Sequence, residues 1–308
     1  MKLYKVLLPI PKHNYFYYSS EYPLFPGMRV EVSFGKRALW GIIVGEDEVD
    51  APPYKVKNIG KLLDEKPYFN QNDLKFLFSV SNYYGYSLGS TLNGIISNKI
   101  LGGFEDTFQK SVLQKSKLAF LSEDQASVFY KIIRKINGGY NCFLLHGVTG
   151  SGKTEIYLEV IKEMIKKEKQ VFYIVPEISL TPQLVERISE RLGFKAVVYH
   201  SRLSSKKRLS VAEGLKNGKI YLVVGARSLL FLPSNSLGLI IVDEEHEPSF
   251  KQEEIPCYNL RDMAVLKGNI FNIPVILGSA TPSLESFYNS KVGKYQYMSL
   301  SKRYHHEG

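Results

Sequence analysis

The chain has 308 residues, 44% of them hydrophobic, so it is long enough for two domains with packed cores and lacks the composition of a disordered protein. Its formal net charge is +10, which suits a polyanionic partner such as nucleic acid but would also fit a solvated basic surface. Its two cysteines, Cys142 and Cys257, are far apart, which excludes a disulfide framework and a cysteine-based zinc site.

The amino-terminal stretch is not expected to be a signal peptide. Pro9 and Pro11 interrupt its short apolar stretch well before the length of a signal peptide. No apolar run in the sequence reaches the length needed to cross a bilayer. We therefore expect a soluble, cytoplasmic protein with no membrane partner.

Residues 1–104 are expected to form a mostly β domain with two helices. Up to about residue 70, short segments rich in Val, Ile and Tyr are separated by Pro and Gly, which predicts a small antiparallel sheet or an open barrel. The alternation in Arg29–Val32 is typical of a half-buried strand. Residues 72–100 predict two helices broken near 85–89, and residues 105–120 are basic and predict a linker.

From residue 121 to residue 308 the sequence alternates strands and helices. The predicted strands are continuous Val/Ile/Leu runs, typical of strands buried on both faces: NCFLLHG, QVFYIVP, KAVVYH, IYLVVG, LGLIIVDE and IPVILGSA. Between them lie helical stretches such as 154–169, with apolar residues on one face. The pattern predicts an α/β lobe with a doubly wound parallel sheet.

The stretch GVTGSGKT, residues 147–154, fits the phosphate-loop pattern and lies between a predicted strand and a predicted helix. Glycines allow backbone N–H groups to surround phosphate oxygens at the start of a helix. Lys153 would reach the β- and γ-phosphates, and the Thr154 hydroxyl would hold Mg²⁺. The candidate nucleotide-binding residues are Gln125, Gly147, Thr149, Gly150, Ser151, Gly152, Lys153 and Thr154.

The apolar run LGLIIV ends in three carboxylates and an imidazole, residues 243–246. By itself this could be a solvated strand end. Strand ends of one parallel sheet meet at the same edge, so Asp243 is expected beside Thr154, where it would fix Mg²⁺. Glu244 would then polarise the attacking water.

Polar residues near other predicted strand ends are weaker candidates. Gln125 stands at a predicted helix start and is interpreted as a surface residue or, alternatively, as a contact to adenine. Ser279 and Thr281 could hydrogen-bond the acidic cluster. His146 and His200 are interpreted as hydrogen-bonded histidines at strand ends.

Five stretches in order, GVTGSGKTEIY, VPEISLTPQ, VVGARSLLF, DEEHEPSFKQ and LGSATPSLES, resemble the primosomal replication-restart DNA helicases, the PriA family of helicase superfamily 2. The resemblance covers essentially the whole chain. It implies an ATP-driven 3′→5′ DNA helicase that recognises stalled forks and reloads the replicative helicase. The implied cofactors are ATP and Mg²⁺; the implied partners are forked DNA, single strands, 3′ ends, primosome proteins and single-strand-binding protein.

The resemblance also implies roles for individual residues of the predicted ATPase lobe. Gln125 matches the adenine-contacting glutamine, and the implied catalytic residues are Lys153, Asp243, Glu244 and His246. Arg227 matches a phosphate contact to the single strand. Residues 248–262 match an aromatic-rich loop that links strand binding to hydrolysis, in which the implied DNA contacts are Phe250, Lys251 and Tyr258. Cys257 and Leu260 stand where the family usually has basic and small residues.

The amino-terminal part resembles the family's pocket for the 3′ end of a nascent strand. The matching residues are Phe16, Tyr18, Gly35 and Lys57. Tyr17 stands where the family usually has Asp. Without the resemblance, the aromatic residues would be interpreted as core residues on strand faces.

The sequence departs from the family in its domain content. The winged-helix domain that usually follows the pocket domain is absent or vestigial, and the chain ends after SATPSLES, at SKRYHHEG. We therefore expect the second ATPase lobe, its arginine finger and the zinc-binding insert to be missing. Zinc is expected only in that missing carboxy-terminal half. Because the arginine finger completes catalysis, we expect poor hydrolysis by this chain alone. The alternatives are a stand-alone fork-end binding module without motor activity and a different phosphate-loop ATPase.

Overall fold

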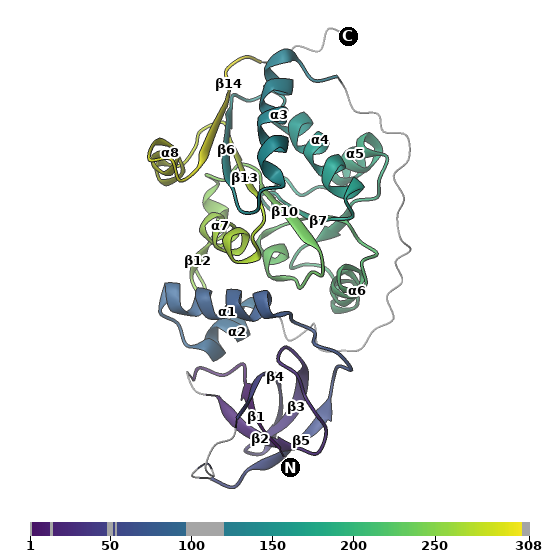
Figure 1. Cartoon of the computed structure of the whole chain (residues 1–308), viewed down its shortest axis with the longest axis vertical. Helices are drawn as coiled ribbons and strands as arrows, with labels where there is room; N and C mark the ends of the chain where they lie inside the picture. Colours follow the sequence, from purple (N-terminus) through teal and green to yellow (C-terminus); the bar gives the residue numbers. More distant parts are fainter. Residues whose placement is uncertain (1, 13–14, 48–51, 53, 97–119, 304–308) are drawn as a thin grey trace. The chain divides into compact units, whose positions relative to one another are not determined.

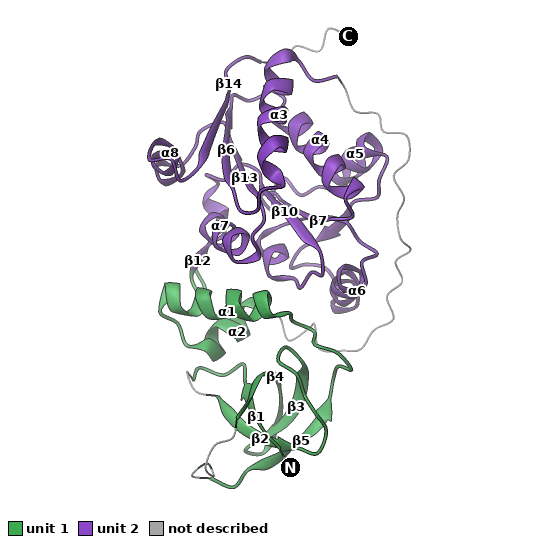
Figure 2. Cartoon of the chain, viewed as in Figure 1, with its two compact units in different colours: residues 1–105, 253–257 green, residues 106–252, 258–308 purple. Residues whose placement is uncertain are grey.

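The structure is a computed structural model that describes residues 2–12, 15–47, 52, 54–96 and 120–303. The chain divides into two compact units: residues 1–105 with 253–257, and residues 106–252 with 258–308 (Figure 2). The expected linker at 105–120 lies outside the described residues except for Phe120. No helix among the described parts of the chain is long and apolar enough to span a membrane.

The first unit contains a closed five-stranded barrel in the order β1-β2-β5-β3-β4. Its strands are β1 (Lys2–Leu7), β2 (Phe16–Ser20), β3 (Arg29–Phe34), β4 (Arg37–Asp47) and β5 (Lys57–Leu62). All pairs are antiparallel except β2 with β5, which run parallel. The expected antiparallel pairing is thus found in four of the five pairs, but the expectation of an open sheet or barrel is wrong, because β5 pairs with β3 on one side and with β2 on the other and so closes the ring.

The interior of the barrel is apolar, with one buried ion pair beside it. Val30 and Val32 of β3 are buried in the barrel core while Glu31 between them is exposed, as the alternation predicts. Arg29 is nevertheless buried, because its guanidinium forms bidentate bonds of 2.6–3.1 Å with the Asp64 carboxylate and lies 3.6 Å from the ring centre of Tyr68.

Two helices follow the barrel, α1 (Gln71–Tyr84) and α2 (Leu88–Ile95), as the sequence predicts. Asn70 and Asp73 form a reciprocal capping box at the start of α1. Gly85 ends α1 in the left-handed conformation, with φ of 70°, which glycine adopts without strain. The helix break predicted near residues 85–89 thus arises from local chemistry.

The second unit contains a seven-stranded parallel sheet in the order β14-β6-β13-β10-β7-β9-β8. The strands are β6 (Cys142–Gly147), β7 (Gln170–Ile174), β8 (Val197–Tyr199), β9 (Leu222–Gly225), β10 (Leu237–Val242), β13 (Val275–Ser279) and β14 (Gln296–Leu300). Six of these were predicted as buried strands. Edge strand β14 was not, because its residues alternate between exposed and buried and lack a continuous apolar run.

Helices cover both faces of this sheet (Figure 1). The helices of the unit are α3 (Glu123–Ile136), α4 (Lys153–Lys166), α5 (Pro182–Leu192), α6 (Ser205–Lys216), α7 (Leu260–Phe271) and α8 (Leu284–Lys291). Apolar residues of α3, α4 and α5 share one core cluster with alternate residues of β6, β7, β9 and β10. The buried Lys267 on α7 lies 5.4 Å from the ring centre of Phe172 on the other face of β7. The doubly wound α/β prediction is confirmed.

Candidate functional site

The phosphate-loop residues join β6 to α4. Gly150 and Gly152 have φ values of 77° and 82°, which favour glycine. A Cβ on Gly152 would lie 2.1 Å from Gln125 Nε2, and one on Gly147 would lie 2.5 Å from Ser151 Oγ. A Cβ on Gly150 would meet no atom within 4 Å. The glycines at 147 and 152 therefore permit close packing within the loop, while Gly150 faces open space.

Two polar groups of the loop suit an anionic ligand. Lys153 is 8% exposed, and its Nζ donates to the Gly147 carbonyl oxygen at 2.8 Å. The Ser151 hydroxyl is buried and finds no hydrogen-bond partner among the described residues. A buried hydroxyl of this kind is costly unless a partner is supplied. The loop therefore fits phosphate oxygens, which would accept from both groups.

The acidic cluster meets the phosphate loop. Lys153 Nζ lies 3.9 Å from Glu244 Oε1, as expected for strand ends at the same edge of the sheet. Glu244 has φ of 51°, a conformation that non-glycine residues rarely adopt and that is often found at functional sites. Thr154 at the start of α4 and Asp243 after β10 offer one hydroxyl and one carboxylate. This donor set fits Mg²⁺, which usually takes one or two carboxylates together with phosphates and water.

The Asp243 carboxylate is partly buried in this cluster. Burial, followed by repulsion from Glu244, raises the pKa of Asp243 above its usual value. Two buried phenols donate to it, Tyr157 from α4 at 3.1 Å and Tyr173 from β7 at 3.2 Å. Sequence reasoning missed both tyrosines. Their positions within an apolar helix face and an apolar strand gave no signal other than a hydroxyl among hydrocarbon neighbours.

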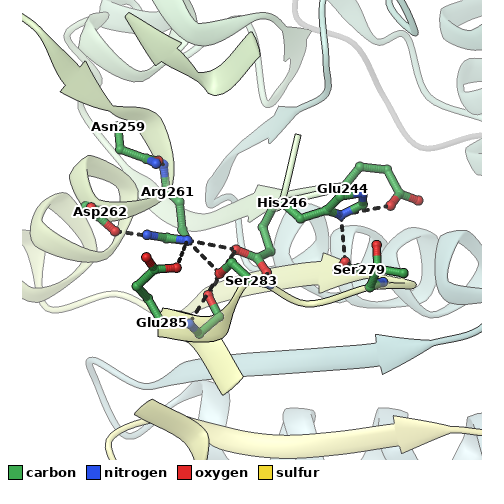
Figure 3. Close-up of polar contacts among 11 residues, drawn as sticks. Glu244, His246, Asn259, Arg261, Asp262, Ser279, Ser283 and Glu285 are labelled. Atoms are coloured by element: carbon green, nitrogen blue, oxygen red, sulfur yellow. Dashed lines mark hydrogen bonds and ion pairs between the residues drawn. The ribbon is translucent and has the colours of Figure 1, made fainter. Parts of the chain in front are cut away.

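Glu245 anchors a second network. Its carboxylate, 2% exposed, accepts from the Ser283 backbone N–H at 2.8 Å and from the Ser283 and Ser286 hydroxyls at 3.0 Å. Arg261 at the start of α7 lies 3.6 Å from it and donates to Ser283 Oγ at 2.6 Å and to Glu285 at 3.4 Å. Arg261 and Ser283 therefore connect three elements around one buried carboxylate (Figure 3).

His246 links the acidic cluster to the segment after β13. Its Nδ1 lies 2.7 Å from Ser279 Oγ and 3.6 Å from Glu244 Oε2 (Figure 3). The Thr281 backbone N–H donates to the same Ser279 oxygen at 2.9 Å. The structure thus brings the Ser279 hydroxyl into contact with His246 of the acidic cluster, as expected, whereas Thr281 hydrogen-bonds Ser279 through its backbone. His146, by contrast, bonds to Tyr297 Oη at 2.8 Å and to the Ala280 carbonyl oxygen at 3.2 Å, which fits a structural histidine.

Gln125 is 1% exposed, so its interpretation as a surface residue is wrong. Its Oε1 accepts from the Ser122 N–H at 2.9 Å, and its Nε2 donates to the Ser151 carbonyl oxygen at 3.0 Å. It therefore ties the start of α3 to the phosphate loop. Beside it lies a pocket of about 320 Å³. The pocket is lined by Ser122, Glu123, Asp124, Gln125, Ser151, Leu300, Lys302 and Arg303.

The residues expected to contact a single strand lie around a short hairpin of β11 (Lys251–Gln252) and β12 (Tyr258–Asn259). Arg227 donates to the Lys251 carbonyl oxygen at 2.7 Å, and Lys251 itself is exposed. Phe250 and Tyr258 are only 1% and 4% exposed. Both rings are packed inside the protein, which contradicts the expectation that Phe250 and Tyr258 contact DNA.

The barrel carries a second pocket, of about 240 Å³. Its lining residues are Phe16, Tyr17, Tyr18, Ser33, Phe34, Gly35, Tyr54, Lys55 and Lys57. The four residues predicted for a 3′-end pocket are thus brought together, and Lys57 Nζ lies 3.4 Å from the Gly35 carbonyl oxygen. Tyr17 donates its hydroxyl to Asp47 at 3.2 Å, and its N–H donates to the Tyr54 hydroxyl at 3.0 Å. Sequence reasoning missed Tyr54.

Comparison with protein families matches both units. The model of the 3′DNA-binding domain (3′BD) of PriA matches residues 5–97. The model of the DEAD/DEAH box helicase matches residues 122–289, which is more than half of the chain. The chain belongs to the DEAD/DEAH box helicase family.

Curated relatives confirm the resemblance to the PriA family. Replication restart protein PriA of Rickettsia conorii is 35% identical over 99% of this chain and 46% of its own length. PriA of Haemophilus influenzae is 33% identical over 98% of this chain and 52% of its own length. PriA of Bacillus subtilis is 41% identical over 69% of this chain and 27% of its own length.

The chain therefore spans about half or less of the length of these relatives. Among solved structures, a crystal structure of DUF1998 helicase MrfA bound to DNA matches with a TM-score of 0.42 and 17% identity, over 65% of this chain and 30% of that chain.

Proposed function

We propose that this chain is the fork-binding and first ATPase portion of an ATP-driven 3′→5′ DNA helicase that recognises stalled replication forks and restarts replication. The observation that carries the proposal is the contact of 3.9 Å between Lys153 and Glu244, at a phosphate loop whose Ser151 hydroxyl is buried without a partner among the described residues. A basic and aromatic pocket in the other unit supports the part of the proposal that concerns DNA.

In this proposal each polar residue of the helicase unit has a separate task. Lys153 and the backbone of the phosphate loop bind the β- and γ-phosphates, and Thr154 and Asp243 hold Mg²⁺. When bound, Mg²⁺ would neutralise charge on the phosphates. Glu244 orients the attacking water and takes its proton. His246, which lies 3.6 Å from Glu244, connects Glu244 to Ser279 at the end of β13.

The proposed partners are forked DNA, single strands and 3′ ends, and beyond these the primosome proteins and single-strand-binding protein. Arg227 and Lys251 are the proposed single-strand contacts that remain accessible, since Phe250 and Tyr258 are buried. The proposed location is the cytoplasm, where replication forks of a bacterial chromosome lie.

Lys57→Ala tests the 3′-end pocket. We expect it to weaken binding to a DNA fork with a free 3′-hydroxyl about 10-fold, because one charge-assisted contact is lost. Lys61→Ala is the matched control, since Lys61 is an exposed lysine of the same strand β5 outside the pocket lining. Fluorescence anisotropy at one fixed salt concentration measures both. Equal losses in the two variants would show that β5 binds the backbone without reading the end.

Gln125→Ala tests the nucleotide pocket. We expect it to weaken ATP binding about 10-fold, through loss of the bond to the Ser151 carbonyl oxygen and of one polar contact to the base. Loss of the contact to the base should weaken GTP binding less than ATP binding, so the ratio of the ATP to the GTP dissociation constant should rise. If the two constants rise equally, Gln125 supports the phosphate loop and does not contact the base.

A further inference from the structure

Two tyrosines surround the carboxylate that follows β10. Tyr157 Oη donates to Asp243 Oδ1 at 3.1 Å, and Tyr173 Oη donates to Asp243 Oδ2 at 3.2 Å. Tyr157 is fully buried on α4, and Tyr173, on β7, is 1% exposed. Both hydroxyls lie deep in the helicase unit and use the same carboxylate as acceptor.

Packing fixes both phenols. The two rings meet edge to face, with centres 5.8 Å apart and planes at 64°. A Cβ on Gly278 of β13 would lie 1.6 Å from Tyr157 Oη and 3.3 Å from Asp243 Oδ1. The Tyr157 hydroxyl therefore occupies the space that any side chain at position 278 would need.

The hydrogen bonds leave the two carboxylate oxygens in different states. Oδ1 also accepts from the Glu244 backbone N–H at 3.1 Å, so both of its lone-pair sites are used. Oδ2 accepts from Tyr173 within the described part of the chain and retains a second site. The carboxylate is thus oriented so that one defined oxygen can take a further partner.

We propose that Tyr157 and Tyr173 are positioning residues that hold the Asp243 carboxylate in the orientation in which Oδ2 binds the nucleotide's Mg²⁺, directly or through a water molecule. This inference rests on the proposed function, in which Asp243 holds the metal ion. Hydrogen bonds to metal-binding carboxylates set their direction, and loss of such a partner typically lowers metal affinity about 10- to 100-fold. Tyr173 matters more, because it bonds the oxygen that retains the free site.

The test is the Mg²⁺ dependence of nucleotide binding by the full chain. A fluorescent ATP analogue is titrated in EDTA and then at rising Mg²⁺ concentrations, with Tyr173→Phe, Tyr157→Phe and Asp243→Asn. We expect the Mg²⁺ midpoint to rise about 10-fold or more in Tyr173→Phe and less in Tyr157→Phe. Affinity in EDTA should stay within about twofold of the unmodified chain, which a general loss of structure would not allow.

Tyr199→Phe is the matched control, because Tyr199 is a buried tyrosine at the end of β8 in the same sheet. The substitution by Phe keeps each ring in the core. If one of the two tyrosine variants does not fold, the Mg²⁺ midpoint of the other tests the inference. If Asp243→Asn removes the Mg²⁺ dependence while both tyrosine variants match the Tyr199→Phe control, the inference is overturned and the proposed function stands. If the Mg²⁺ dependence persists in Asp243→Asn, the metal-binding role of Asp243 fails as well.

Discussion

Lys153→Ala is expected to weaken ATP binding about 100-fold or more. The Lys153 ammonium is 8% exposed and lies between the Gly147 carbonyl oxygen at 2.8 Å and Glu244 at 3.9 Å. A phosphate bound there would gain charge-assisted bonds that contribute about 1.5–3 kcal/mol each in a site shielded from water. Isothermal titration calorimetry with ATP and Mg²⁺ measures the loss.

The control for this variant is Lys166→Ala. Lys166 lies at the far end of the same helix, where its side chain is 51% exposed and pairs with Glu163. The substitution removes the same charge from the chain, so nonspecific attraction of the nucleotide changes equally. We expect an affinity within about twofold of the unmodified chain, since exposed pairs contribute only about 0–1 kcal/mol. Equal losses of ATP affinity in the two variants would show that Lys153 does not bind the phosphates.

Arg261→Met is expected to lower the free energy of unfolding of the helicase unit by about 3–5 kcal/mol. The Glu245 carboxylate, which is 2% exposed, would keep its serine donors but lose the cation that compensates its charge. For a unit of this size the loss corresponds to a fall in melting temperature of roughly 6–20 °C. Thermal unfolding followed by circular dichroism measures it.

Glu285→Gln is the control for this network. Glu285 also pairs with Arg261, at 3.4 Å, but its side chain is 69% exposed. Exposed ion pairs contribute about 0–1 kcal/mol, so the melting temperature should hardly change. If Arg261→Met is as mild as Glu285→Gln, the ion pair with Glu245 contributes little and the serine donors alone hold the buried carboxylate.

The phosphate loop and the acidic strand end could be predicted because local chemistry dictates them. Gly150 and Gly152 allow positive φ values at the turn into α4, and the buried run of β10 ends at Asp243 whatever surrounds it. The rule that parallel strands end at one edge of a sheet is enough to predict that the phosphate loop and the acidic cluster lie close together, and the contact between Lys153 and Glu244 agrees with it. The starts of helices α1 and α2 are likewise determined by neighbouring residues, because Asn70 and Ser87 cap them.

Other parts of the site depend on packing between distant residues. The two phenols on Asp243 lie 86 and 70 positions from it in the chain, in an apolar helix face and an apolar strand. Arg261 and Glu245 read as ordinary charged residues until the fold buries both. Phe250 and Tyr258 match an aromatic-rich loop, yet tertiary packing covers their rings. Closure of the barrel through β2 and β5 is also nonlocal, because alternation fixes the face of a strand but not its neighbour.

The measurement that tests the account most directly is the affinity of the full chain for a short DNA fork ending in a free 3′-hydroxyl, compared with the same fork ending in a 3′-phosphate. Fluorescence anisotropy at one salt concentration removes the general contribution of the positive charge. We expect clearly tighter binding of the free hydroxyl, because in the proposed function the pocket around Phe16, Gly35 and Lys57 receives the terminal nucleotide. Equal affinity for the two forks would contradict recognition of the 3′ end by this chain.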